Sequence, residues 1–208
     1  METIGYEDVV RMICAAAAKI RENETLLSAL DSAAGDGDHG TTVCKVMEAA
    51  VAATRERGGS VAELLNKVGW EMMCVDGGAT PPLLGSFFIG MAEGASGPDR
   101  LDLARAFQGG VTAMREHTQA QIGDKTMMDA LLPAVAACCG DSPVSALRAA
   151  AEAAMRGAEA TKTMVAKWGR ARHLGDRTLG RADPGATSVA LMFEGFAEAI
   201  HERKTHHG

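Results

Sequence analysis

Three carboxylates and an imidazole lie close together near the start of the chain. Asp31, Asp36, Asp38 and His39 belong to the run Leu30-Asp31-Ser32-Ala33-Ala34-Gly35-Asp36-Gly37-Asp38-His39-Gly40. Closely spaced carboxylates repel one another, so a fold retains such a cluster when a cation binds within it. Hard carboxylate oxygens select Mg²⁺, Ca²⁺ or Mn²⁺. The sequence therefore predicts a divalent-cation site formed by the three aspartates, which could hold two Mg²⁺ ions.

The glycine spacing in this run resembles known nucleotide-binding loops without matching them. The G-x-G-x-x-G fingerprint of dinucleotide-binding proteins follows a strand, whereas a helical pattern precedes Gly35. A P-loop would need a lysine where Thr41 stands, and an EF-hand starting at Asp36 would have glycine and methionine at two liganding positions. The remaining alternative to a cation site is a solvated turn in which Asp38 caps the next helix.

Helix starts provide candidate anion sites beside this acidic loop. Thr41, Thr42 and the free N–H groups of the helix expected after Gly40 offer hydrogen-bond donors to phosphate. The segments Asp76-Gly77-Gly78-Ala79-Thr80 and Asp183-Pro184-Gly185-Ala186-Thr187-Ser188 repeat this arrangement, although ordinary capping is the alternative for the second. Three such helix starts at one end of a bundle suggest that one polyphosphate binds there.

Two further segments are candidates for the same site. In residues 123–128 we expect Asp124 to cap a helix, while Met127 and Met128 could form an apolar wall for an adenine ring. Residues 169–182 read as one long irregular loop, and long loops in compact domains tend to be functional. We expect one arginine of this loop to reach the phosphates and the others to be solvated; the four are Arg170, Arg172, Arg177 and Arg181.

The elements that must position these residues are predicted to be helices. Hydrophobic residues make up 47% of the chain but aromatic residues only 4%, a composition that favours helices over sheets. We expect an all-α, barrel-like bundle of eight or nine antiparallel helices, formed by one domain over residues 1–208. Helix starts are predicted near Tyr6, Asn23, Gly40, Ser60, Thr80, Leu101, Asp124, Ser142 and Asp183, with the longest helix after Ser142.

Composition also excludes several classes of function. The net charge of −6 argues against nonspecific nucleic-acid binding. No signal peptide is recognisable, and no apolar run reaches the roughly 18 residues that would span a membrane. Five cysteines without a C-x-x-C pair suggest reduced thiols in a cytoplasmic protein, and no Cys or His pair has the spacing of a zinc site.

Five motifs together resemble the nucleotide-binding L subunit, or L domain, of the dihydroxyacetone kinases. They follow the same order along nearly the whole chain, and although each is weak alone, five in order are specific. The resemblance implies an eight-helix antiparallel barrel with a nucleotide site at one end. The motifs are Leu30-Asp31 with Gly35 to Gly40, Gly77 to Thr80 with Pro82 to Phe88, Gly123 to Met127, Leu174-Gly175-Asp176-Arg177, and Asp183 to Ser188.

The resemblance also implies roles for individual residues. Asp31, Asp36 and Asp38 match Mg²⁺ ligands that link the protein to the phosphates of ADP or ATP. No catalytic residue is assigned within the chain beyond Arg177, a candidate phosphate stabiliser. Met127 matches the adenine side. The full set that matches nucleotide contacts is His39, Gly40, Thr41, Thr42, Ala79, Thr80, Gly123, Met127, Arg177, Asp183, Pro184 and Gly185.

The same resemblance implies a partner, because in this family a separate K subunit holds the ketose covalently on a histidine. The expected activity is phosphoryl transfer from the nucleotide to dihydroxyacetone or a related short ketose. A short separate chain favours a phosphotransferase-system protein that rephosphorylates bound ADP, whereas Thr41-Thr42 resembles the branch that uses free ATP.

Two other classes of protein share some of these features. The alternative function is that of a nucleotide-sensing module that binds a protein partner such as a transcription factor. The sequence leaves open whether the chain forms a homodimer. A fatty-acid-kinase-like domain is disfavoured because those chains are longer.

Overall fold

Helices make up almost all of the regular structure. The computed structural model describes residues 3–33, 35–56 and 58–205. Short 3₁₀ segments (η1 Ala92–Gly94, η2 Thr161–Thr163, η3 Arg170–Thr178) and a two-stranded antiparallel ribbon (β1 Ala95–Gly97, β2 Arg100–Leu101) complete it. The α-helices are α1 Tyr6–Glu22, α2 Glu24–Ser32, α3 His39–Thr54, α4 Val61–Met73, α5 Thr80–Met91, α6 Leu103–Met114, α7 Met128–Ala137, α8 Pro143–Ala160 and α9 Pro184–Thr205. The predicted all-α class is confirmed.

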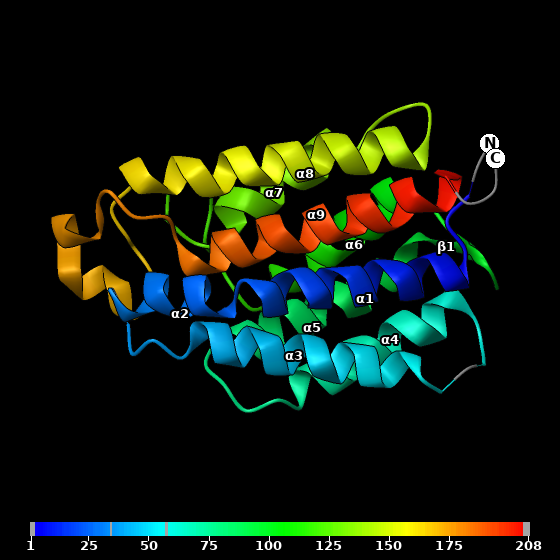
Figure 1. The fold of residues 1–208 in the computed structure, drawn as a ribbon, viewed down its shortest axis with the longest axis horizontal. Coiled ribbons are helices and arrows are strands. Elements are labelled where there is room, and N and C mark those ends of the chain that lie inside the picture. The colour runs from blue at the N-terminus through cyan, green and yellow to red at the C-terminus, as the bar shows by residue number, and fades with distance from the viewer. Residues whose placement is uncertain (1–2, 34, 57, 206–208) are drawn as a thin grey trace.

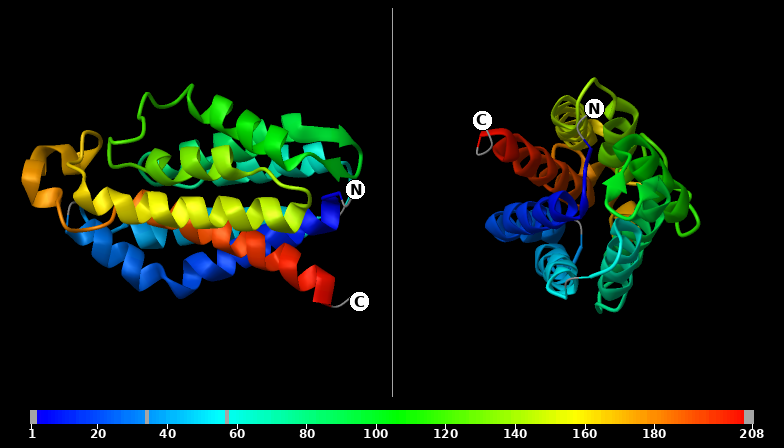
Figure 2. Two further views of the ribbon diagram at one scale, coloured as in Figure 1. Left: turned by 90° about the horizontal axis from the view of Figure 1, so that it is seen from above. Right: turned by 90° about the vertical axis from the view of Figure 1, so that its right-hand side faces the viewer.

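Eight of these helices form a closed ring. Each of α1, α3, α4, α5, α6, α7 and α8 packs against the next in that order, and α9 closes the ring by packing against both α8 and α1. Neighbours run in opposite directions, and the view along the helices in Figure 2 shows them around a common axis. The short helix α2 covers α3 and α9 at one end. Consequently α3, α5, α7 and α9 all begin at the end remote from the chain termini (Figure 1).

The ring is filled by a phenylalanine cluster among small residues. All five phenylalanines of the chain are at most 1% exposed. They come from α5, α6 and α9, and the closest rings, Phe107 and Phe193, have centroids 5.1 Å apart. Because most of the other inward positions hold alanine, methionine and valine, the helices pack closely around these rings. None of the described helices combines the length and apolar character needed to cross a membrane.

Three local predictions need correction. Helix α7 begins at Met128 rather than at Asp124, because the backbone takes a left-handed conformation at Lys125 (φ 59°) and Asp129 accepts the N–H groups of Gly123 and Thr126. The longest helix is α9, with 22 residues against 18 in α8. The segment expected to be an irregular loop contains the 3₁₀ turns of η3.

Candidate functional site

A cavity of about 730 Å³ opens at the end of the ring where α3, α5, α7 and α9 begin. Its lining includes the first residues of all four helices, among them His39, Thr80, Met128 and Pro184. The first N–H groups of a helix have no partner within that helix, and the helix dipole places partial positive charge there. Four converging helix starts therefore favour an anionic ligand.

Charged side chains reinforce this preference. The cavity is lined by five cationic residues and only three acidic ones, although the chain as a whole carries a net charge of −6. Such segregation of charge concentrates positive potential where it can attract an anion. The cationic residues are Arg115, Lys125, Arg170, Arg177 and Arg181, and the acidic ones are Asp31, Glu116 and Asp183.

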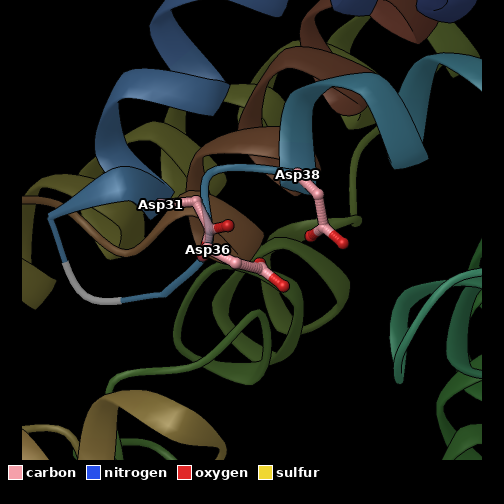
Figure 3. Close-up of side chains that lie close together, drawn as sticks. All are labelled: Asp31, Asp36 and Asp38. Atoms are coloured by element: carbon pink, nitrogen blue, oxygen red, sulfur yellow. The ribbon is translucent and has the colours of Figure 1, made fainter.

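The acidic cluster lies at the edge of this cavity. Carboxylate oxygens of Asp31, Asp36 and Asp38 all lie within 4.8 Å of one another, and Figure 3 shows the three side chains projecting from α2 and the loop after it. Asp31 also shapes the loop, because its Oδ2 accepts the N–H of Gly37 at 2.9 Å and that of His39 at 3.4 Å. Asp38 occupies the N-cap position of α3 but its side chain caps nothing, so the simple capping interpretation is wrong. The arrangement suits a divalent cation.

A glycine permits the close approach of α2 and α3 that brings Asp31 to the loop. A Cβ atom at Gly40 would lie 2.3 Å from the carbonyl oxygen of Glu24 and 2.4 Å from the hydroxyl of Ser28. Any side chain at this position would push the two helices apart. Gly40 therefore acts on the acidic cluster through packing.

Arg170 binds the acidic cluster directly. Its guanidinium pairs with Asp36 and lies 3.8 Å from Asp38. This contact lowers the pKa of Asp36, whereas desolvation and the neighbouring Asp36 carboxylate raise the pKa of Asp38. Arg170, Arg177 and Arg181 all line the cavity with exposed side chains, so three arginines of residues 169–182, rather than one, lie where they could face a phosphate.

His39 joins three of the helix starts. It is 8% exposed, and its Nε2 lies 2.7 Å from the hydroxyl of Ser188 on α9. Since that hydroxyl donates its proton to the carbonyl of Pro184, Nε2 must carry the imidazole proton. Burial lowers the pKa of His39, so the ring is neutral and its Nδ1 is left as an acceptor, 3.5 Å from the hydroxyl of Thr80 on α5.

The structure brings most, but not all, of the predicted site residues to the cavity. Thr41 instead donates its hydroxyl to Glu24, Thr42 is buried beside Gly77, and Gly123 donates its N–H to Asp129. Asp36 and Asp38 lie outside the lining, in the acidic cluster. The predicted residues that line the cavity are Asp31, His39, Ala79, Thr80, Met127, Arg177, Asp183, Pro184 and Gly185.

Sequence reasoning missed part of the lining. Residues 115–120 after α6, Lys125 and Trp168 all border the cavity. The polar stretch after α6 has no motif, and Trp168 lies outside the periodic patterns, so only proximity in the sequence to the Gly-Asp-Lys-Thr-Met motif and to the arginine-rich loop pointed toward them. Lys125 belongs to that motif, but the motif assigned it no role.

Asp183 makes the stability of the fold depend on pH. Its side chain caps α9 by accepting the N–H of Ala186, as predicted by the capping alternative. Desolvation raises the pKa of this carboxyl from 3.8 to about 7. The folded state thus binds this proton more tightly than the unfolded state. We expect the free energy of unfolding to fall as pH rises from about 4 to about 7, by up to about 1.4 kcal/mol per pH unit, with no further loss above that window.

Urea unfolding of the wild type and of Asp183→Asn, measured across this pH range, checks the prediction. The amide oxygen of the variant can still accept the N–H of Ala186, so helix capping is retained. The difference in stability between the two proteins should change with pH. A constant difference would contradict the raised pKa.

The fold and site together define the class: an all-α barrel with an anion-binding cavity at one end and a carboxylate cluster beside it. A family model described as the DAK2 domain matches residues 33–198. The chain belongs to the DAK2 domain family.

Three similar proteins illustrate how this domain occurs. The ADP-binding subunit DhaL of a PTS-dependent dihydroxyacetone kinase from Lactococcus lactis is 34% identical, over 88% of this chain and 91% of its own length. D-erythrulose kinase from Mycolicibacterium smegmatis is 35% identical over 94% of this chain, which spans only 36% of that enzyme. The crystal structure of the dihydroxyacetone kinase from C. freundii in complex with AMP-PNP and Mg²⁺ matches with a TM-score of 0.74 and 28% identity, over 96% of this chain and 35% of that one.

Proposed function

We propose that this chain is the nucleotide-binding subunit of a dihydroxyacetone or related short-ketose kinase. One observation carries the proposal: a three-carboxylate cluster lies beside a basic cavity at which four helices begin. Phosphoryl transfer depends mainly on positioning and on stabilising negative charge, which these features supply. Membership of the DAK2 family and the names of the relatives support the same function.

The acidic cluster fits Mg²⁺ because its donors are all carboxylate oxygens. Asp31, Asp36 and Asp38 would hold the metal, which would neutralise charge on the nucleotide phosphates. The helix N–H groups at the cavity would bind phosphate oxygens, and Arg177 would stabilise charge that develops during transfer. Arg170 pairs with Asp36 and lies 3.8 Å from Asp38, and a metal held by these carboxylates would leave its guanidinium available to the phosphates.

The nucleoside end would lie at the start of α7. Met127, 9% exposed at the start of α7, would supply an apolar wall for the adenine ring. The chain would act as one nucleotide-binding domain and would pass the phosphoryl group to a ketose held by a K-type partner subunit. The donor is either a phosphotransferase-system protein acting on bound ADP or free ATP.

Calorimetry and kinase assays test this function. We expect Mg-ADP to bind and the pair formed with a K-type partner to phosphorylate dihydroxyacetone. Binding of Mg-ADP without turnover of any short ketose would overturn the kinase assignment in favour of a nucleotide-sensing module. ADP retained through purification would indicate the phosphotransferase-system donor, and an empty or freely exchanging site would indicate ATP.

A further inference from the structure

The segment that carries Arg170 and Arg177 is held at both ends by one side chain. This segment, residues 162–181, here called the arginine segment, leaves the ring after Thr161 and returns before α9. The Nζ of Lys125 donates to the carbonyl of Thr161 at 2.6 Å and to the carbonyl of Arg181 at 2.7 Å. A single ammonium thus bridges both ends of the segment, beside the backbone hydrogen bond from the N–H of Gly180 to the carbonyl of Lys162 at 2.8 Å.

Lys125 lines the cavity, and its ammonium is directed at the two carbonyls. It is 6% exposed and lies in the turn before α7, in the left-handed backbone conformation already described. Asp129, 1% exposed, holds that turn by accepting the N–H groups of Gly123 and Thr126. Burial lowers the pKa of Lys125, and the carboxyls of Asp183 and Asp129, which face the ammonium, offset only part of this cost.

The preceding residue holds a third point of the segment. One carboxylate oxygen of Asp124 pairs with the ammonium of Lys167 at 2.8 Å, and the other accepts the indole N–H of Trp168 at 2.9 Å. The carbonyl of Asp124 also accepts the N–H of Lys167 at 3.1 Å. Two consecutive residues therefore hold both ends and the outgoing arm of the arginine segment, and we call them the Asp124-Lys125 anchor.

We propose that the Asp124-Lys125 anchor is a positioning device that fixes the arginine segment over the cavity. The inference rests on the proposed function, because it assigns the anchor to retention of the nucleotide. Arg170 lies at the acidic cluster and Arg177 at the cavity, so a segment detached at its base would lose both placements. Since the segment borders the cavity, its detachment would mainly speed the release of the nucleotide.

Hydrogen exchange and nucleotide release of the Lys125→Met variant test the anchor. Methionine keeps the length of the side chain but donates no hydrogen bond. We expect amide exchange in residues 164–181 to rise at least about tenfold, and release of Mg-ADP by stopped flow to rise by a similar factor, while exchange in α5 and α9 stays unchanged. Lys162→Met is the matched control, because its exposed ammonium pairs only with Glu159 in the described contacts.

Hydrogen exchange of the nucleotide-free protein tests the anchor independently of the proposed function. Unchanged exchange of residues 164–181 in Lys125→Met would overturn the anchor, whether or not nucleotide binds. Failure of the wild type to bind Mg-ADP would overturn the proposed function, and exchange would still decide the anchor.

A second variant covers the case in which Lys125→Met does not fold. Trp168→Phe removes the indole donor to Asp124 from a side chain that is 40% exposed, so the fold is retained. It should raise exchange of the arginine segment about threefold, in the same direction as the lysine variant. No rise in exchange in this variant would contradict the anchor.

Discussion

Replacing Asp36 with asparagine is expected to abolish Mg²⁺-dependent binding of ADP while leaving the helical fold intact. The change removes one of three carboxylates whose oxygens lie within 4.8 Å of one another. Loss of a partner that only supports a metal ligand costs about 10–100-fold in metal affinity, so loss of a direct ligand should cost more than about 100-fold. The side chain is 48% exposed and its ion pair with Arg170 lies at the surface, so stability should change little.

Titration calorimetry with ADP, in the presence of Mg²⁺ and then of a chelator, measures this effect. Asp141→Asn, an exposed acid in the turn before α8 at the other end of the ring, is the matched control. Asp36 is a cleaner test than Asp31, because Asp31 also binds the N–H groups of Gly37 and His39 and its loss would distort the loop. Unchanged ADP affinity in Mg²⁺ would show that the metal site lies elsewhere.

Arg177→Ala is expected to reduce phosphoryl transfer about 10³-fold while changing Mg-ADP affinity less than about tenfold. Arg177 lines the cavity from η3, where its guanidinium can face the phosphates. Charge on the transferred group grows toward the transition state, so an arginine aimed there contributes more to the rate than to ground-state binding. The variant should therefore lose kcat rather than affinity.

Initial rates with a K-type partner and dihydroxyacetone, together with ADP affinity, check this result. Arg172→Ala is the matched control, since Arg172 belongs to the same segment but lies outside the cavity lining and bonds to His173. Arg177→Lys should restore only part of the rate, because an ammonium cannot reproduce the planar fork of donors. Equal rates in Arg177→Ala and Arg172→Ala would contradict a role in transfer.

Features that depend on neighbouring residues were predictable from the chain alone. The capping box at Ser60 and the Ser-Pro start at Ser142 are both present, because capping involves residues only three positions apart. The acidic cluster was predictable for the same reason, since Asp31, Asp36 and Asp38 are joined by one short loop. Local geometry was less predictable where distant groups take part: α7 begins at Met128, and the carboxylate of Asp124 binds Lys167 and Trp168 instead of capping a helix.

Only the tertiary structure decided which residues far apart in the chain contact one another. Arg170 and Asp36 are 134 positions apart, and no periodicity indicates which arginine of a polar segment will meet an acidic loop. The ammonium of Lys125 donates to backbone carbonyls 36 and 56 positions away. Every residue has a backbone carbonyl, so no residue type in the sequence identifies these partners. Residue types and short spacings therefore determined the helices and the chemistry of the acidic loop. Packing of the ring determined which cations reach that loop, because helix order and orientation depend on the whole core.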